Sequence, residues 1–171
     1  MKKHTLLLAA TLLLLQAFAQ KTDVNKKLLT GTWNLRYFGN TDFVIDADNQ
    51  LQTVTQRVKV VMAQAKDHIL SEKDSAELVK QTYLQCRQVD SSTFQFNADR
   101  TAQLLFYLPI DGEAGTVKKA TYYWVDDTHL MLDFGDDKTQ LTVLVLNDKR
   151  FEARANDDKD PGERITLKLA K

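Results

Sequence analysis

Seven short runs in the second half of the chain alternate apolar with polar residues, and each run predicts a β-strand. They cover residues 93–97, 101–108, 115–125, 129–134, 139–146, 150–155 and 163–170. An earlier run of the same kind, at about 32–38, brings the expected number of strands to eight. Every second side chain in a run is apolar, so each strand would bury one face and keep the other in water.

A stretch at about 50–86 breaks the alternation and has a helical period instead. Its apolar residues recur three and four positions apart in two stripes: Val54, Val58, Val61, Ala65 and Ile69, then Ala76, Val79, Tyr83 and Cys86. Between the stripes, Ser71 is placed to cap the start of a new helix. We predict two consecutive helices, or one kinked helix, inserted between the first and second strands.

Eight sequential antiparallel strands can close into a barrel, which removes the exposed edges of an open sheet. Three expected connections are tight turns, at 97–100, 126–128 and 147–149, whereas the helical insertion and segments 109–114, 135–138 and 156–162 are longer. In an up-and-down barrel these two sets lie at opposite ends, so one end would be closed and the other open. The insertion would lie over the open mouth or against the wall beside it.

We therefore predict a mostly β fold, an eight-stranded antiparallel up-and-down barrel with a helical insertion. An open curved sheet with the helices packed in its concavity is the alternative. Both arrangements need the same strand faces, so the period of the pattern does not separate them.

The beginning of the chain has the layout of a signal peptide. It combines a basic start at 2–4, an apolar run at 6–15 that is too short to span a bilayer, and small residues at Ala17 and Ala19. We expect cleavage before Gln20, which would leave 20–171 as a single periplasmic or secreted domain with no membrane span.

The charge balance and the cysteine content of the chain argue against several kinds of binding partner. The chain has 23 basic and 23 acidic residues; residues 1–19 hold two lysines and no acidic residue, so the remainder has a formal charge of −2. This balance argues against binding to nucleic acid or to an anionic lipid surface. Cys86 is the single cysteine, and its place in the helical stripe favours a buried side chain over a reactive thiol or an intermolecular bridge.

The motif Gly31-Thr32-Trp33 opens the first expected strand. It resembles the Gly-x-Trp motif of the lipocalins and of the lipocalin-like domains of bacterial envelope proteins. The resemblance implies that Gly31 and Trp33 plug the closed end of the barrel, beneath a cation supplied by Lys168, Lys171 or Arg150. Residues 94–101 also resemble the Phe-x-Phe-x-x-Asp-Gly-Thr hairpin of those bacterial domains, with Arg100 in place of the glycine.

Large side chains on the expected inner faces form a candidate ligand-binding site: Leu35, Tyr37, Phe94, Phe96, Phe106, Tyr122, Trp124, Leu132 and Phe151. An eight-stranded barrel is just wide enough to be filled by side chains or to hold one small ligand. The functional interpretation is an apolar cavity in which the hydroxyls of Tyr37 and Tyr122 orient the ligand. The alternative is a filled core.

Catalytic and metal-binding patterns are weak in this sequence. His68 and His129 have no neighbour whose spacing predicts an oriented catalytic partner. Segment 156–163 resembles a calcium loop, but its glycine comes one position late and Lys159 adds a positive charge, so we expect a plain turn. We expect no cofactor, no metal and no enzymatic activity.

Two functions fit these observations. The first is a non-catalytic secreted or periplasmic protein that binds a small hydrophobic or amphipathic molecule inside the barrel. The second is an interaction or structural module of the bacterial envelope, with a filled barrel and with the helical insertion as its contact surface for a protein partner.

Overall fold

The computed structural model describes residues 23–40, 43–64, 71–107, 115–156 and 164–171, and the predicted signal peptide therefore lies outside the described residues. Eight long strands make up the barrel: β2 (Gly31–Gly39), β4 (Thr93–Phe96), β5 (Thr101–Phe106), β6 (Thr116–Trp124), β7 (His129–Asp133), β8 (Lys138–Leu146), β9 (Arg150–Asn156) and β10 (Arg164–Ala170).

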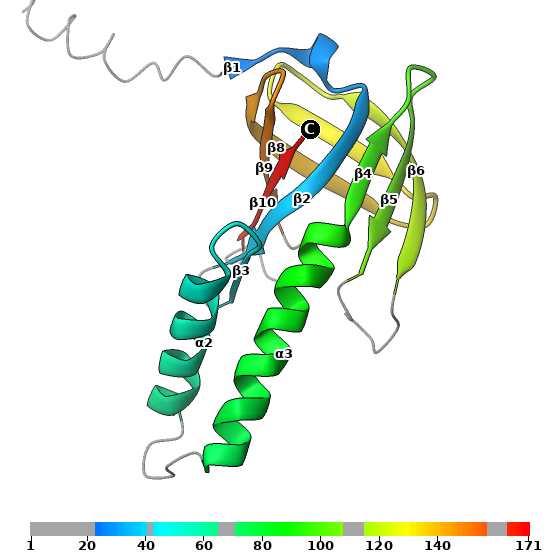
Figure 1. Ribbon diagram of the computed structural model, residues 1–171. Coiled ribbons are helices and arrows are strands. Elements are labelled where there is room, and N and C mark those ends of the chain that lie inside the picture. Colours follow the sequence, from blue (N-terminus) through cyan, green and yellow to red (C-terminus); the bar gives the residue numbers. More distant parts are fainter. Residues whose placement is uncertain (1–22, 41–42, 65–70, 108–114, 157–163) are drawn as a thin grey trace, which may run out of the picture.

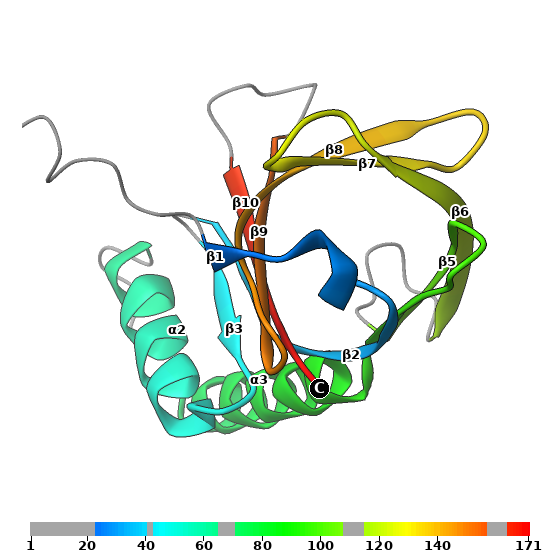
Figure 2. The same cartoon turned by 90° about the horizontal axis from the view of Figure 1, so that it is seen from above.

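The barrel is closed and antiparallel throughout (Figure 1). Each of these strands pairs with the next one along the chain, and the last strand, β10, pairs back onto β2. Seen along its axis, the ring of strands is continuous (Figure 2). The prediction of an eight-stranded up-and-down barrel is confirmed, and the alternative of an open curved sheet is wrong.

Three short elements were not predicted, because each is too short to show a period. They are β1 (Asp23–Val24), which pairs in parallel with β8, the 3-10 helix η1 (Lys26–Leu28), and β3 (Val44–Asp46), which pairs with the end of β2. Counted along the chain, the helices α2 (Gln50–Gln64) and α3 (Glu72–Ser91) follow β3 and precede β4. The sequence pattern placed the helices directly after the first barrel strand. That position is not confirmed, because β3 lies between β2 and α2.

The helices form a pair that projects away from the barrel (Figure 1) and lies beside its outline rather than across its mouth (Figure 2). Ser71 caps α3 as predicted, since its side chain accepts a hydrogen bond from the Asp74 amide at 3.1 Å. The helix continues to Ser91 because Val89 extends the buried stripe beyond Cys86. Tyr83, which was expected to face inward, is exposed.

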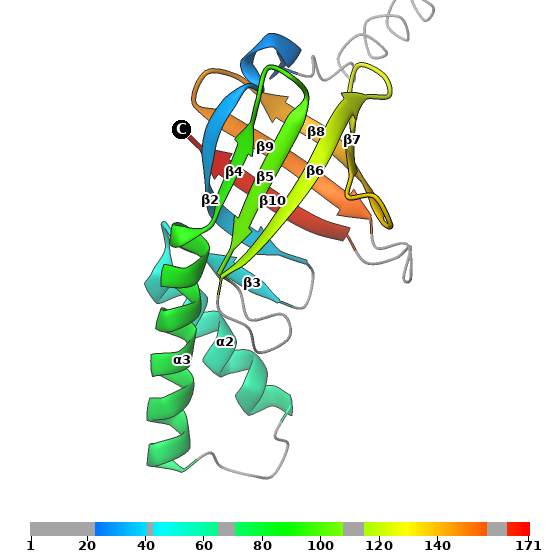
Figure 3. The ribbon, with the colours of Figure 1, turned by 90° about the vertical axis from the view of Figure 1, so that its right-hand side faces the viewer.

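The two ends of the barrel differ as the connection lengths predicted. Tight turns join β4 to β5, β6 to β7 and β8 to β9 at the end where β2 begins and β10 finishes (Figure 3). Each of these turns is closed by a backbone hydrogen bond, from Asn97 to Thr101, from Val125 to His129 and from Asn147 to Arg150. The longer connections leave the strands at the opposite, open end.

Trp33 lies at the closed end and is completely buried. Its indole Nε1 donates a 2.7 Å hydrogen bond to the carbonyl of Leu29, just after η1. The Lys171 ammonium lies 4.6 Å from the centre of the tryptophan ring and donates to the Leu28 carbonyl at 3.2 Å. Of the three cations expected there, Lys171 therefore occupies the position over the ring. Gly31 has a φ of 125°, a conformation that favours glycine, and a Cβ there would lie 3.6 Å from the Lys171 side chain.

Candidate functional site

The expected inner face of β2 is interrupted by a bulge at Arg36. Leu35 pairs with Leu169 while Tyr37 pairs with Lys168, so β2 contributes one extra residue between these two pairs. Leu35 points into the barrel and is completely buried, but Tyr37 lies on the outside, with the Lys168 ammonium 4.6 Å from its ring centre. The prediction that Tyr37 faces the barrel interior is wrong. Phe38 takes the inward position in its place.

The half of the barrel next to the closed end is filled with aromatic side chains. The Phe151 ring meets Trp33 edge-on at 5.8 Å and Phe96 at 6.0 Å, and Phe96 meets Tyr122 at 5.3 Å. The Tyr122 hydroxyl donates a 2.7 Å hydrogen bond to the Asn97 carbonyl, in the tight turn between β4 and β5. This hydroxyl is therefore already used inside the protein, and these rings form a packed core.

Trp124 also belongs to the closed end. It is the last residue of β6, next to the tight turn, and the Lys26 ammonium lies 5.3 Å from its ring centre. Trp124 packs against the core, and Leu35 is part of that core. Of the candidate ligand-binding residues, Leu35, Tyr37, Phe96, Tyr122, Trp124 and Phe151 thus lie outside the pocket described next.

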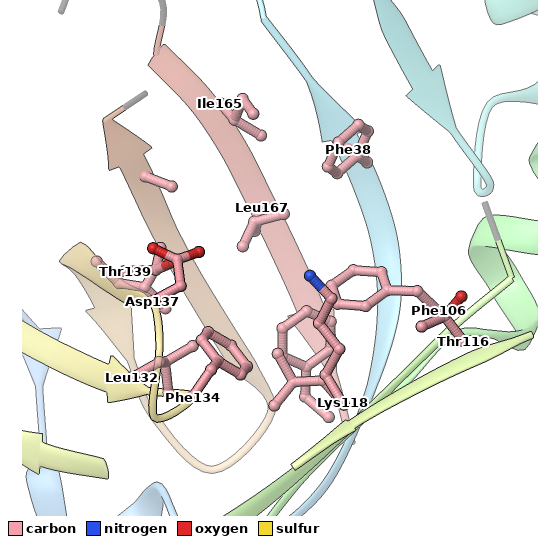
Figure 4. Close-up of a pocket in the computed structure, with 14 residues that line it drawn as sticks. Phe38, Phe106, Thr116, Lys118, Leu132, Phe134, Asp137, Thr139, Ile165 and Leu167 are labelled. Carbon is pink, nitrogen blue, oxygen red and sulfur yellow. The ribbon is translucent and has the colours of Figure 1, made fainter. Parts of the chain in front are cut away.

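A pocket of about 480 Å³ occupies the open half of the barrel (Figure 4). Three predicted residues line it, namely Phe94, Phe106 and Leu132, and the rings of Phe94 and Phe106 meet edge-on at 5.0 Å. The other apolar side chains in its wall are Phe38, Leu104, Phe134, Leu141, Ala155, Ile165 and Leu167. A mostly apolar cavity of this size with a few polar groups is the usual form of a small-molecule site.

Four polar side chains also line the pocket. Thr116 and Lys118 come from β6, whereas Asp137 precedes β8 and Thr139 lies within it. Figure 4 shows the Lys118 ammonium pointing into the pocket among aromatic rings, and this ammonium lies 5.7 Å from the centre of the Phe134 ring. The pocket therefore combines an aromatic wall with one cation and one carboxylate.

The sequence contained evidence for Lys118 that the prediction did not use. Lys118 stands two residues before Ala120 and four before Tyr122, on the same face of β6, and both of these residues are buried. A lysine in phase with inward residues near the open end of a barrel points into its mouth. Phe134 also lay in the expected strand at 129–134, on the same face as Leu132, but it was not among the candidate site residues. In the structure it lies just beyond the end of β7 and lines the pocket.

Other chemistry is limited in the described residues. His129 contacts Asp126 at 2.7 Å in the tight turn after β6, where hydrogen bonds from Thr128 and His129 lower the pKa of the Asp126 carboxyl. This pair caps a turn at the closed end, far from the pocket lining. No cluster of three or more metal-ligating side chains is found in the described part of the chain. Neither described helix is long and apolar enough to cross a membrane.

Comparison with known proteins finds distant structural likenesses, of which two are described here. The chain matches no family model and no curated protein. A solved structure titled "Bovine Odorant Binding Protein deswapped triple mutant" is 14% identical with a TM-score of 0.41, over 84% of this chain and 73% of that one. A structure of "Odorant Binding Protein OBP1" is also 14% identical with a TM-score of 0.41, over 87% of this chain and 75% of that one. The fold assignment given above therefore rests on the strand pairing alone.

Proposed function

We propose that this protein binds one small hydrophobic or amphipathic molecule in the open-end pocket, as a non-catalytic binding protein of the periplasm or the extracellular space. The observation that carries the proposal is the pocket of about 480 Å³ between the packed closed half and the open end. At roughly 30 Å³ for each non-hydrogen atom of a liquid, this volume accommodates about 16 such atoms. The signal-peptide pattern at 1–19 supports export.

A titration with a neutral dye whose fluorescence rises in apolar surroundings tests the proposal. We expect saturable binding of one dye per chain and displacement by a neutral long-chain alcohol. Ala155 lies in the pocket wall, so Ala155→Phe fills the space and should weaken dye binding at least tenfold. Ala76→Phe is the matched control, because Ala76 is exposed on α3. Dye binding that does not saturate, or that Ala155→Phe leaves unchanged, contradicts the proposal.

The interaction module remains a second candidate, because the projecting helices carry exposed apolar side chains. Leu51 is 71% exposed, Met62 54% and Leu84 48%. These residues lie outside the apolar stripe that the sequence predicts on α2, in which Val54 is buried and Val58 and Val61 are half-buried. If this function holds, a partner captured from envelope extracts by the natural chain is lost when these three exposed residues are changed to serine.

A further inference from the structure

We infer that the ligand of the open-end pocket is an amphipathic anion, a carboxylate with an apolar tail, and that Lys118 selects its charged end. The inference rests on the proposed function and adds the chemical class of the ligand. It follows from the place of Lys118 in the barrel, from the surroundings of its ammonium group and from the position of the one opposing charge.

Strand pairing fixes the direction of Lys118. It lies opposite Leu104 on β5, and residues that pair directly in a sheet point to the same face. Leu104 is almost completely buried inside the barrel. The next residue, Lys119, points the opposite way from Lys118 and pairs with Gln103 on the outer face. Lys118 therefore reaches inward, towards the pocket that it lines.

The ammonium of Lys118 contacts an aromatic ring, and no described carboxylate lies within ion-pairing distance of it. Two other lysines show the contrast, since Lys138 pairs with Asp133 at 2.9 Å and Lys26 with Asp127 at 2.8 Å. Water solvates the Lys118 ammonium while the pocket is open. A ligand that displaces this water leaves a buried, unpaired cation unless the ligand itself supplies an anion.

Asp137 is the opposing charge in the pocket lining. It is in the connection before β8 and is exposed, so it stays hydrated when a ligand fills the apolar part of the pocket. Lys118 is exposed as well, two residues inside β6, but its ammonium lies over the Phe134 ring, where a ligand in the apolar part of the pocket would cover it. The arrangement thus favours an anion.

Competition between three ligands of equal length tests the inference: dodecanoate, dodecanol and dodecylamine, each displacing the neutral dye. We expect dodecanoate to bind about tenfold more tightly than dodecanol, with dodecylamine the weakest of the three. In Lys118→Met the ratio of dodecanoate to dodecanol affinity should fall to about one. Lys118→Arg should retain the ratio, and so should Lys119→Met, the matched control on the outer face. Added salt should reduce the ratio in the natural protein.

Each other outcome has a definite meaning. Equal affinities for dodecanoate and dodecanol in the natural protein overturn the inference while leaving the proposed function intact. A ratio that Lys118→Met does not change also overturns it. Tighter binding of dodecylamine, abolished by Asp137→Asn, assigns the selecting charge to Asp137 and overturns it too. Failure of the neutral dye and all three ligands to bind overturns the proposed function itself.

Discussion

Arg100 has a φ of 68° in the tight turn between β4 and β5, and it is the one non-glycine residue with a positive φ in the described part of the chain. Its backbone is fixed there, because its amide donates to Asn97 and its carbonyl accepts from Tyr122. A residue with a Cβ in this conformation carries a strain of roughly 1–2 kcal/mol. We expect Arg100→Gly to raise the free energy of unfolding by about 1 kcal/mol, as measured by urea denaturation.

Arg100→Ala is the control for this substitution, because alanine keeps the Cβ and hence the strain. It should be no more stable than the natural protein. Equal stabilisation by alanine and glycine would mean that the arginine side chain, and not the backbone conformation, is unfavourable. The hairpin resemblance had already indicated that glycine is usual at this position, and the observed φ supplies the physical reason.

Cys86 is completely buried on α3, beside Thr53 of α2. Burial raises the pKa of its thiol above the usual value, so the reactive thiolate is rarer at any given pH than in an unfolded chain. We expect iodoacetamide at pH 8 to modify Cys86 at least a hundredfold more slowly in the folded protein than in urea, followed by mass spectrometry. Rapid modification without urea, or a disulfide-linked dimer, would contradict the buried position.

At the scale of elements, Arg36 connects the bulge in β2 to the helix pair. Its guanidinium forms ion pairs with Asp48, which precedes α2, and with Asp90 near the end of α3. The hydrogen bond and charge of Asp48, with the nearby charge of Asp90, raise the pKa of Arg36. The extra residue in β2 thus places the Arg36 guanidinium outside the barrel, next to the start of α2 and the end of α3.

Arg36→Met should therefore loosen the helix pair more than the barrel. We expect faster hydrogen exchange in the last turn of α3 and a loss of stability of roughly 1 kcal/mol, since both ion pairs are partly solvated. Arg87→Met, at an exposed position of the same helix, is the control and should change neither quantity. Exchange that rises equally in β6 and β7 would show that Arg36 stabilises the barrel as a whole.

The alternation of apolar and polar residues predicted the barrel, because every second side chain of a strand points inward and strands that follow one another in the sequence pair with one another. It could not predict the bulge at Arg36, because a single extra residue shifts the phase without interrupting the run of strand-forming side chains. Tyr37 was assigned inward for that reason, and Phe38 was not among the candidate site residues. The short strands β1 and β3 were missed because pairing with β8 and β2, rather than their own sequence, defines them.

The residues of the candidate site were predicted only in part. Alternation indicates which residues face inward, but not how far along the axis the interior is filled. Phe94, Phe106 and Leu132 line the pocket, whereas Phe96 and Phe151 face the same interior and pack against Trp33 or each other. Only the three-dimensional arrangement separates the filled half from the open one.

At the scale of the whole molecule, the two halves of the barrel interior are packed differently. The closed half packs Trp33, Phe151 and Phe96 in edge-to-face contact and buries each of them almost completely. The open half leaves Phe106 and Phe134 only partly buried around the pocket. Close packing stabilises the fold, whereas side chains that border a void contribute less to stability and would be available to the proposed ligand.

The same substitution in the two halves should consequently have different effects. Phe151→Leu removes packed atoms and should lower the free energy of unfolding by about 1–2 kcal/mol. Phe106→Leu removes atoms beside the pocket, so it should cost less than about 1 kcal/mol while weakening dye binding severalfold. Urea denaturation and dye titration of both variants measure the two effects. Similar losses of stability in the two variants would contradict this division of the interior. So would a loss of dye binding confined to Phe151→Leu, because a change at the closed end reaches the pocket only if the whole interior is one packed core.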